Sequence, residues 1–281
     1  MKSTWSIMLA SLLIGAGCGG AESGDEADGA IDTAEQAVVV VSGKTLFTQG
    51  KLGGNGRTCL TCHGEATGTF SLAEAQDRFD DDPTDPLFRA IDSDDGTGAT
   101  YHRLLDHGTV FVTIPLTSGV TLAGDPAAAS VRLERSVPST LDRPALDPAL
   151  MWDGRAVTLQ DQALGAIRGH AEATETPSAA TLTKIADYEK TLFSSNDLRK
   201  LPNGGAPRAL PLGKTAAEQR GRLFFLDLPL SPPSLHGFCA SCHSGPMLEV
   251  TNQWNPAQPA GLRFSTALVS EINLRNIPPR T

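Results

Sequence analysis

The chain has 281 residues, a formal net charge of −9 and only 5% aromatic residues. The acidic balance argues against nucleic acid and against an anionic membrane surface as partners. Hydrophobic residues make up 40% of the chain, which is ordinary for a globular protein once its 28 glycines are added. The scarcity of aromatic side chains nevertheless leaves little flat apolar bulk for the core of a plain domain.

The first 18 residues carry the features of an export signal. Met1-Lys2 gives a basic start, the segment 7–14 is a short apolar run, and three small residues precede Cys18. This run is too short to span a bilayer, which takes about 20 residues of helix. Small residues before a cysteine resemble a bacterial lipobox. We therefore expect a periplasmic protein that is held at the membrane only by a lipid on Cys18, with a secreted or soluble periplasmic form as the alternative.

Residues 19–41 are predicted to form a disordered acidic tether. From Gly19 to Ala37 the segment is rich in glycine, alanine and serine, and it contains six acidic residues and no basic one. It has too little apolar area to offset the entropy lost on ordering. The globular part of the chain is therefore expected to begin at about Ser42.

Two five-residue motifs carry the clearest chemical signal. Residues 59–63 and 239–243 both read C-x-x-C-H. The cysteines and histidine of the pattern are Cys59, Cys62 and His63 in the first motif and Cys239, Cys242 and His243 in the second. In this pattern two thiols can bond to the vinyl groups of haem, and the adjacent imidazole can bind its iron. Zinc sites pair their C-x-x-C elements about 15 to 20 residues apart, whereas these lie 180 positions apart. The sequence therefore predicts two covalently bound c-type haems, which would also supply flat apolar bulk.

Outside these motifs, the hydrophobic pattern predicts helices joined by long loops, with little strand periodicity. The expected helices run from an N-cap at Ser42 to Phe47, from Thr158 to Ile167, from Pro177-Ser178 to Phe193, and from a capping box at Thr215 to Leu226.

The segment 201–212, with three prolines and two adjacent glycines, is predicted to be a linker. We therefore expect an all-α protein with two cytochrome c-like haem domains. The first would span residues 42–200, and the second would span residues 213–281.

Residues outside the haem motifs resemble the di-haem cytochrome c peroxidase family, which includes the MauG-type enzymes. The resemblance extends over about residues 42–281 and rests on M-W-D-G-R-A at 151–156, Gln162-Ala163-Leu164, Glu172, G-R-L-F-F at 221–225, C-H-S-G-P at 242–246 and L-R-N at 274–276. It implies an enzyme that reduces hydrogen peroxide to water at the His63 haem. Electrons would come from a small cytochrome c or cupredoxin and enter at the His243 haem.

The resemblance also implies roles for three side chains. The family's tryptophan between the haems, proposed to relay electrons, corresponds to Trp152. The glutamine and glutamate of the peroxide pocket correspond to Gln162 and Glu172. A partly desolvated carboxylate can take a proton from one peroxide oxygen and return it to the other, while an amide holds the oxygen in place. Composition alone would also allow core packing for Trp152, an exposed helix position for Gln162 and a surface loop for Glu172.

Axial and calcium ligands follow the family less closely. In the family, a histidine that can leave the iron often faces the first haem. The candidates for this role here are His102 and His107, of which His107 is preferred. The alternative is that they are ordinary surface or core histidines. The second haem normally takes a methionine or tyrosine beyond L-R-N, but after His243 the chain has only Met247 and no tyrosine, so the second domain is expected to be truncated. Ser136 replaces the asparagine of the family's calcium site, so a calcium ion is only weakly supported.

Other functions stay open at this point. The chain could be a MauG-like oxidase that withdraws electrons from a protein substrate, a non-catalytic di-haem electron carrier with both irons six-coordinate, or an inactive truncated chain. A homodimer is one option for its assembly.

Overall fold

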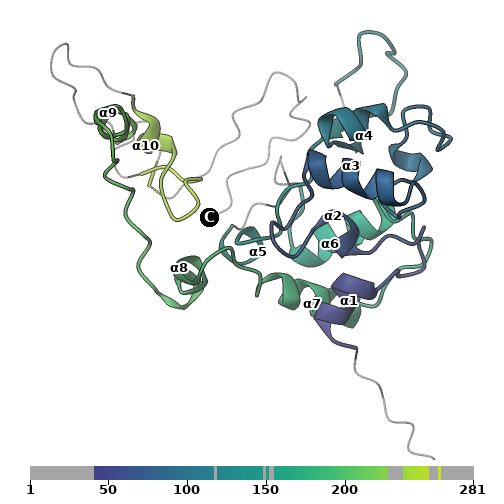
Figure 1. The fold of residues 1–281 in the computed structure, drawn as a ribbon, viewed down its shortest axis with the longest axis horizontal. Helices are drawn as coiled ribbons and strands as arrows, with labels where there is room; N and C mark the ends of the chain where they lie inside the picture. Colours follow the sequence, from purple (N-terminus) through teal and green to yellow (C-terminus); the bar gives the residue numbers. More distant parts are fainter. Residues whose placement is uncertain are drawn as a thin grey trace, which may run out of the picture. The chain divides into compact units, whose positions relative to one another are not determined.

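The structure is a computed structural model that describes residues 41–116, 119–147, 150–151, 155–226, 237–252 and 259–260. These residues form short helices and one two-stranded sheet (Figure 1). The helices are α1 (Gly43–Gln49), α2 (Cys59–Cys62), α3 (Leu72–Asp81), η1 (Ala90–Asp92), α4 (His102–His107), α5 (Arg143–Leu146), α6 (Leu159–Gly169), α7 (Ala179–Glu189), α8 (Asn196–Arg199), η2 (Leu201–Asn203), α9 (Ala216–Phe225) and α10 (Cys239–Cys242). Within the described ranges, none of these helices has the length and apolar character needed to cross a membrane.

The capping signals of the sequence set the starts of four helices. Ser42, Thr158, Ser178 and Thr215 each accept a hydrogen bond from the backbone N–H three residues later, at the N-termini of α1, α6, α7 and α9. These four helices are confirmed. Helix α7 ends at Glu189 and not at Phe193. After Glu189 the backbone hydrogen bonds join residues three apart, as in a 3-10 turn; for example, the Leu192 N–H donates to the Glu189 carbonyl.

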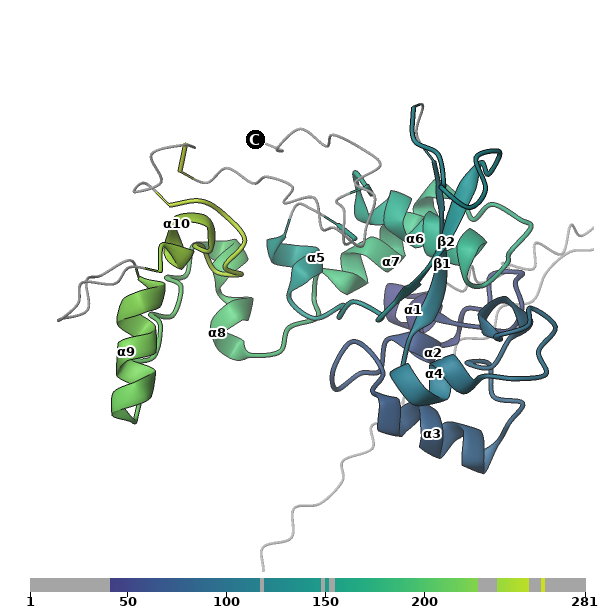
Figure 2. The ribbon, with the colours of Figure 1, turned by 90° about the horizontal axis from the view of Figure 1, so that it is seen from above.

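The prediction of an all-α protein is wrong. Strands β1 (Val110–Pro115) and β2 (Ser130–Arg135) pair antiparallel, with Val110 opposite Arg135 (Figure 2). In addition, the α-helices and 3-10 helices together contain only 39% of the described residues. The sequence of β1, V-F-V-T-I-P, consists largely of β-branched and aromatic residues, which favour strands. A short apolar run of this kind does not alternate, so periodicity alone cannot separate it from a buried helix.

Two hydrophobic clusters meet at the first C-x-x-C-H motif. Half-buried Cys62 packs against one cluster, and half-buried Cys59 packs against the other. The first cluster contains Phe70, Ala75, Leu87, Phe88, Tyr101, Leu104 and Val110, and the second contains Phe47, Ala163, Ile167, Ala173, Leu182 and Ile185. Because α2 has only four residues, its position depends on this packing and not on its own helical stability.

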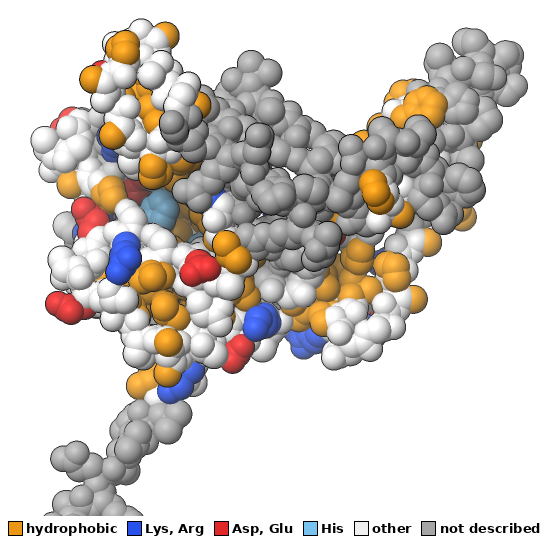
Figure 3. Space-filling view, turned by 180° about the vertical axis from the view of Figure 1, so that it is seen from behind, with side chains coloured by type: hydrophobic (Ala, Val, Ile, Leu, Met, Phe, Trp, Pro, Cys, Tyr) orange, Lys and Arg blue, Asp and Glu red, His pale blue; other side chains and the backbone are white. Residues whose placement is uncertain are grey.

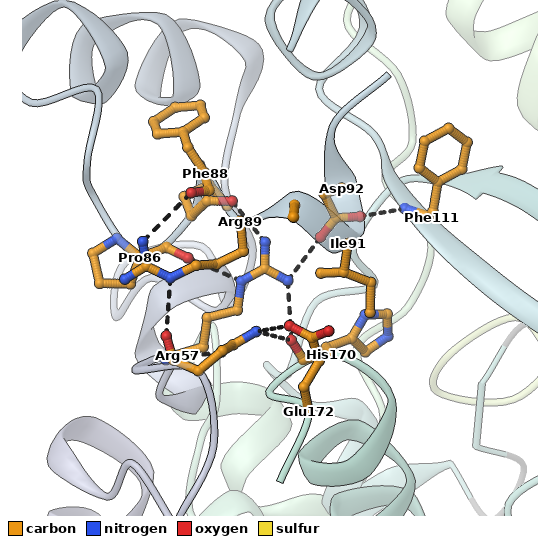
Figure 4. Close-up of polar contacts among 12 residues, drawn as sticks. Arg57, Pro86, Phe88, Arg89, Ile91, Asp92, Phe111, His170 and Glu172 are labelled. Atoms are coloured by element: carbon orange, nitrogen blue, oxygen red, sulfur yellow. Dashed lines mark hydrogen bonds and ion pairs between the residues drawn. The ribbon is translucent and has the colours of Figure 1, made fainter. Parts of the chain in front are cut away.

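A buried ion pair joins the segment before α2 to η1. The Nη1 atom of Arg57 lies 2.7 Å from Oδ2 of Asp92, and their side chains are only 2% and 0% exposed. The other carboxylate oxygen of Asp92 accepts the backbone N–H of Phe111 in β1 at 2.6 Å. The guanidinium of Arg57 also donates to three backbone carbonyls, those of Pro86, Leu87 and His170 (Figure 4). These hydrogen bonds supply the compensation that a buried charge pair requires.

We predict that Asp92→Asn lowers the free energy of unfolding by about 3–5 kcal/mol, because it leaves the buried charge of Arg57 without its counter-charge. Urea denaturation followed by far-UV circular dichroism measures this change. Asp197→Asn is the matched control, since Asp197 forms only exposed ion pairs and its loss should cost at most about 1 kcal/mol. Equal effects of the two substitutions would contradict the prediction.

Glu189 is a buried acid at the end of α7. The residue is 4% exposed, and its Oε2 atom has no hydrogen-bond partner among the described residues. Burial raises the pKa of this carboxyl from its ordinary value near 4.5 to about 8. Glu189 is therefore protonated in the folded protein at neutral pH.

This shift predicts a pH dependence of stability. Between pH 4.5 and about 8 the unfolded state releases the Glu189 proton while the folded state keeps it, so the free energy of unfolding should fall as pH rises through this window. One proton accounts for a slope of at most about 1.4 kcal/mol per pH unit. Glu189→Gln should remove that slope in urea denaturations across the window, whereas Asp187→Asn, at an exposed site on the same helix, should keep it.

Candidate functional site

A cavity of about 480 Å³ opens beside the first C-x-x-C-H motif. Cys59, Cys62 and His63 form one part of its wall, β1 and the end of β2 form another, and α6 forms a third. Figure 3 shows a histidine in a hollow of the described surface, flanked by hydrophobic side chains. A cavity of this volume falls within the range of about 300–1,000 Å³ that is usual for small-molecule and cofactor sites.

His63 is held in the orientation that a metal ligand needs. It directly follows α2, its backbone N–H donates to the Cys59 carbonyl at 2.9 Å, and its Nδ1 lies 2.8 Å from the carbonyl oxygen of Gly68. A carbonyl can only accept, so Nδ1 carries the proton and Nε2 keeps its lone pair. Burial lowers the pKa of His63 and keeps its ring neutral. The free Nε2 could therefore bind iron.

Gly68 fixes the carbonyl that orients His63. Its φ is +66°, and a Cβ at this position would come within 2.7 Å of the Thr140 nitrogen and 2.8 Å of the Leu141 nitrogen. The same carbonyl also accepts the N–H of Thr140 at 3.0 Å. A glycine is therefore required at this position, both for the backbone conformation and for the close approach of the neighbouring chain.

The second motif, described by itself, has the same local geometry. His243 follows α10 with φ −115° and ψ 73°, compared with −117° and 74° at His63. Its Nδ1 lies 3.0 Å from the carbonyl of Leu248, which is five residues later, as Gly68 is five residues after His63. In both histidines Nδ1 therefore bonds to a backbone carbonyl, and Nε2 lies outside that hydrogen bond. Their environments differ, since His243 is exposed and His63 is half-buried.

The four cysteines of the motifs are half-buried, and none of them forms a disulfide with another described residue. Burial raises the pKa of Cys59 to about 12 and also raises the pKa of Cys62. Both thiols are therefore neutral in the protein as described, and a thioether bond to haem would likewise leave them uncharged.

Helix α6 provides a wall of small residues. Gly165, Ala166 and Gly169 line the cavity, and a Cβ at either glycine would meet no atom within 4 Å. A flat ring can approach the helix closely along such a face. Gln162 lines the same cavity as His63, so the structure brings these two predicted site residues together.

Glu172 does not line the cavity. Its side chain is exposed, and its Oε2 accepts a hydrogen bond from Asn55 Nδ2 at 2.7 Å. Its φ of +53° lies in the left-handed region, which is uncommon for a residue with a side chain. In this conformation Glu172 is therefore not the partly desolvated carboxylate that the sequence predicts.

The remaining predicted site residues lie elsewhere. Trp152, Cys18 and the L-R-N element fall outside the described residues. His102 and His107 are the first and last residues of α4; both are exposed, and neither lines the cavity. His107 Nδ1 instead lies 3.8 Å from Glu134 Oε2 on β2. The structure therefore does not bring the preferred histidine candidate to the first haem site.

Sequence reasoning missed two contributors to the cavity. One is β1, whose residues 110–114 all line it. The other is His170, the C-cap of α6, whose pKa is lowered by burial so that its ring is neutral. The signal for His170 was weak, because the helix predicted from the sequence ended at Ile167, whereas α6 continues to Gly169 and places His170 at its C-cap.

Comparisons with known proteins place the chain in a family. Searches of curated proteins and of solved structures find no significant match. A family model described as di-haem cytochrome c peroxidase matches residues 39–196, which is more than half of the chain and includes the first motif, β1, β2 and α6. The chain therefore belongs to the di-haem cytochrome c peroxidase family, whose members use haem in peroxidase- or oxidase-type redox chemistry.

Proposed function

We propose that the protein is a c-type di-haem peroxidase that reduces hydrogen peroxide to water with electrons from a small cytochrome c or cupredoxin. The observation that carries this proposal is the matched geometry of His63 and His243. Each follows a C-x-x-C turn and has Nδ1 fixed on a carbonyl five residues later. Haem, when bound, supplies the electron chemistry that splits the O–O bond.

The residues of the first motif fit a covalently bound haem. Cys59 and Cys62 would hold it through thioether bonds, and His63 Nε2 would bind its iron, while the small face of α6 leaves room for the ring. Cys239, Cys242 and His243 would hold the second haem in the same way. Exposed His243 suits a haem that receives electrons from another protein, and Trp152 would relay them onward.

One side chain would position the peroxide and another would transfer its proton. The amide of Gln162, in the cavity wall, can hold a peroxide oxygen by donating and accepting hydrogen bonds. The carboxylate of Glu172 would take a proton from one oxygen and return it to the other. Because Glu172 is exposed and bound to Asn55, this role requires the segment after His170 to move. Release of the left-handed conformation at Glu172 would favour such a movement.

We also propose where the enzyme acts. The export signal and Cys18 would place it in the periplasm with a lipid anchor as its only membrane contact, which is the compartment that small redox donors share. Its net charge of −9 would favour a donor with a basic face.

Haem content tests the cofactor assignment. The wild type should carry two covalently bound haems, and Cys59→Ala combined with Cys62→Ala should leave one. The corresponding pair at Cys239 and Cys242 should also leave one, and all four substitutions should leave none. Pyridine haemochrome spectra and intact-protein mass spectrometry measure this number, and a wild-type protein without covalent haem would refute the proposal.

Glu172→Gln tests the acid–base assignment. Loss of the proton-transfer group should lower peroxide turnover with a reduced cytochrome by about 10²- to 10⁴-fold, with haem content unchanged. Glu175→Gln is the matched control, because Glu175 is an exposed acid three residues later, and it should keep wild-type turnover. Full turnover in the Glu172→Gln variant would exclude Glu172 as the acid–base group.

A further inference from the structure

A second cavity shares a wall with the cavity beside the first motif. Its volume is about 440 Å³, and it is lined by Glu189 at the end of α7 and by Arg143 at the start of α5. The residues that line both cavities are His63, Pro138, Met151 and Gln162. The two cavities therefore meet at the histidine and the amide of the candidate site.

Glu189 is the buried acid of the second cavity. Its Oε2 atom is shielded from solvent and has no hydrogen-bond partner among the described residues. Burial raises its pKa to about 8, so the carboxyl carries a proton at neutral pH. Buried polar atoms nearly always have a partner. The partner that the described residues do not give to Oε2 has to come from the contents of the cavity.

The second cavity suits water. Ser139, Thr140 and Gln162 add hydroxyl and amide groups to its wall, and a buried water needs only about 10–15 Å³ and two to four polar partners. The side chain of Arg143 is 53% exposed, so the cavity reaches solvent beside α5. It can therefore hold a chain of waters between solvent and Gln162, with Glu189 along the way.

Few charges face Glu189 across this space. Helices α1, α5 and α6 pack against α7, and their charged residues are Lys44, Arg143, Asp161 and Arg168. Of these, only Arg143 lines the second cavity, and its Nη1 lies 3.6 Å from Oδ2 of Asp147. From the first motif, His63 and Cys59 are both neutral. The carboxyl of Glu189 therefore keeps its proton until a polar molecule in the cavity takes it.

The proposed reaction needs protons from outside the peroxide. When the O–O bond breaks, one oxygen leaves as water with both protons of the peroxide, one of them moved by Glu172. The other oxygen forms two new O–H bonds, and it takes two electrons from the reduced donor and two protons from solvent. Hydrogen peroxide, two protons and two electrons thus give two waters. A shielded site needs a route for these two protons.

We propose that Glu189 passes these protons from the waters of the second cavity to the peroxide site at Gln162. This inference rests on the proposed function. The carboxyl gives its proton to a water at the shared wall and takes another from water near Arg143, so it is unchanged after each transfer. Glu189 acts through water and does not touch the peroxide. Its role adds to that of Glu172, which only moves a proton between the two peroxide oxygens.

Glu189→Gln tests this route in the full-length, haem-loaded protein. Glutamine keeps the size and neutral charge of the protonated acid but cannot pass a proton on. The variant should keep its haem content and lower peroxide turnover at neutral pH by about 10²-fold. Wild-type turnover should stay level below about pH 8 and fall above it as Glu189 loses its proton, whereas the variant should show no such step. Asp187→Asn, at an exposed site on α7, is the matched control and should behave like the wild type.

Infrared spectra of the same haem-loaded proteins give a readout apart from turnover. At neutral pH the C=O stretching band of a protonated carboxyl should be present in the wild type and in Asp187→Asn, and absent in Glu189→Gln. The band should shift in D₂O, because the cavity lets the buried proton exchange with solvent.

A band that does not shift after equilibration in D₂O would overturn the proposal, and so would wild-type turnover in Glu189→Gln. These outcomes differ from failure of the proposed function. A haem-loaded wild type without peroxide turnover would refute both, whereas an active wild type with an unaffected Glu189→Gln variant would refute the proton route alone.

Discussion

The buried ion pair between Arg57 and Asp92 fixes the walls of the cavity beside the first C-x-x-C-H motif. Arg57 precedes α2, Asp92 ends η1, and their remaining hydrogen bonds reach β1 through Phe111 and the end of α6 through His170. Two charges this deeply buried are stable only while each keeps its partners. The pair thus sets the spacing between the first motif and the elements that face it. It also makes the cavity sensitive to a substitution at Asp92, which does not line it.

The hairpin of β1 and β2 is attached to the segment that carries Asp92. The ring of Phe111 lies between two guanidinium groups, with Cζ of Arg103 at 3.7 Å and Cζ of Arg132 at 3.4 Å from its centroid. Arg103 also donates to the Asp92 carbonyl, and Arg132 to the Ile91 carbonyl. A two-stranded hairpin is marginally stable alone, so these contacts explain how β1 can serve as a firm wall of the cavity.

The sequence predicted those features that depend on neighbouring residues. The caps at Ser42, Thr158, Ser178 and Thr215 act over three positions, and the chemistry of the C-x-x-C-H motifs lies within five. Contacts between distant segments could not be predicted from the sequence. Asn55 donates a hydrogen bond to Glu172, 117 positions away, and Arg57 donates one to the carbonyl of His170, 113 positions away. For this reason the family spacing identified Gln162 in the cavity wall, but it could not show that Glu172 is exposed or that His170, not His107, lines the same cavity as His63.

The two motifs are alike in their backbone and differ in what surrounds them. Both fix Nδ1 on a carbonyl, and this sets the basicity of the ligand in the same way. Exposure is then the described property that would separate two haems bound at these motifs, because it tunes reduction potential. The first motif packs through Cys62 and Cys59 against two hydrophobic clusters, and His63 lines a cavity, whereas His243 is exposed. A shielded site suits controlled access of a small substrate and an exposed site suits contact with a partner protein, so a difference in role between the two motifs would come from their environment and not from the motif itself.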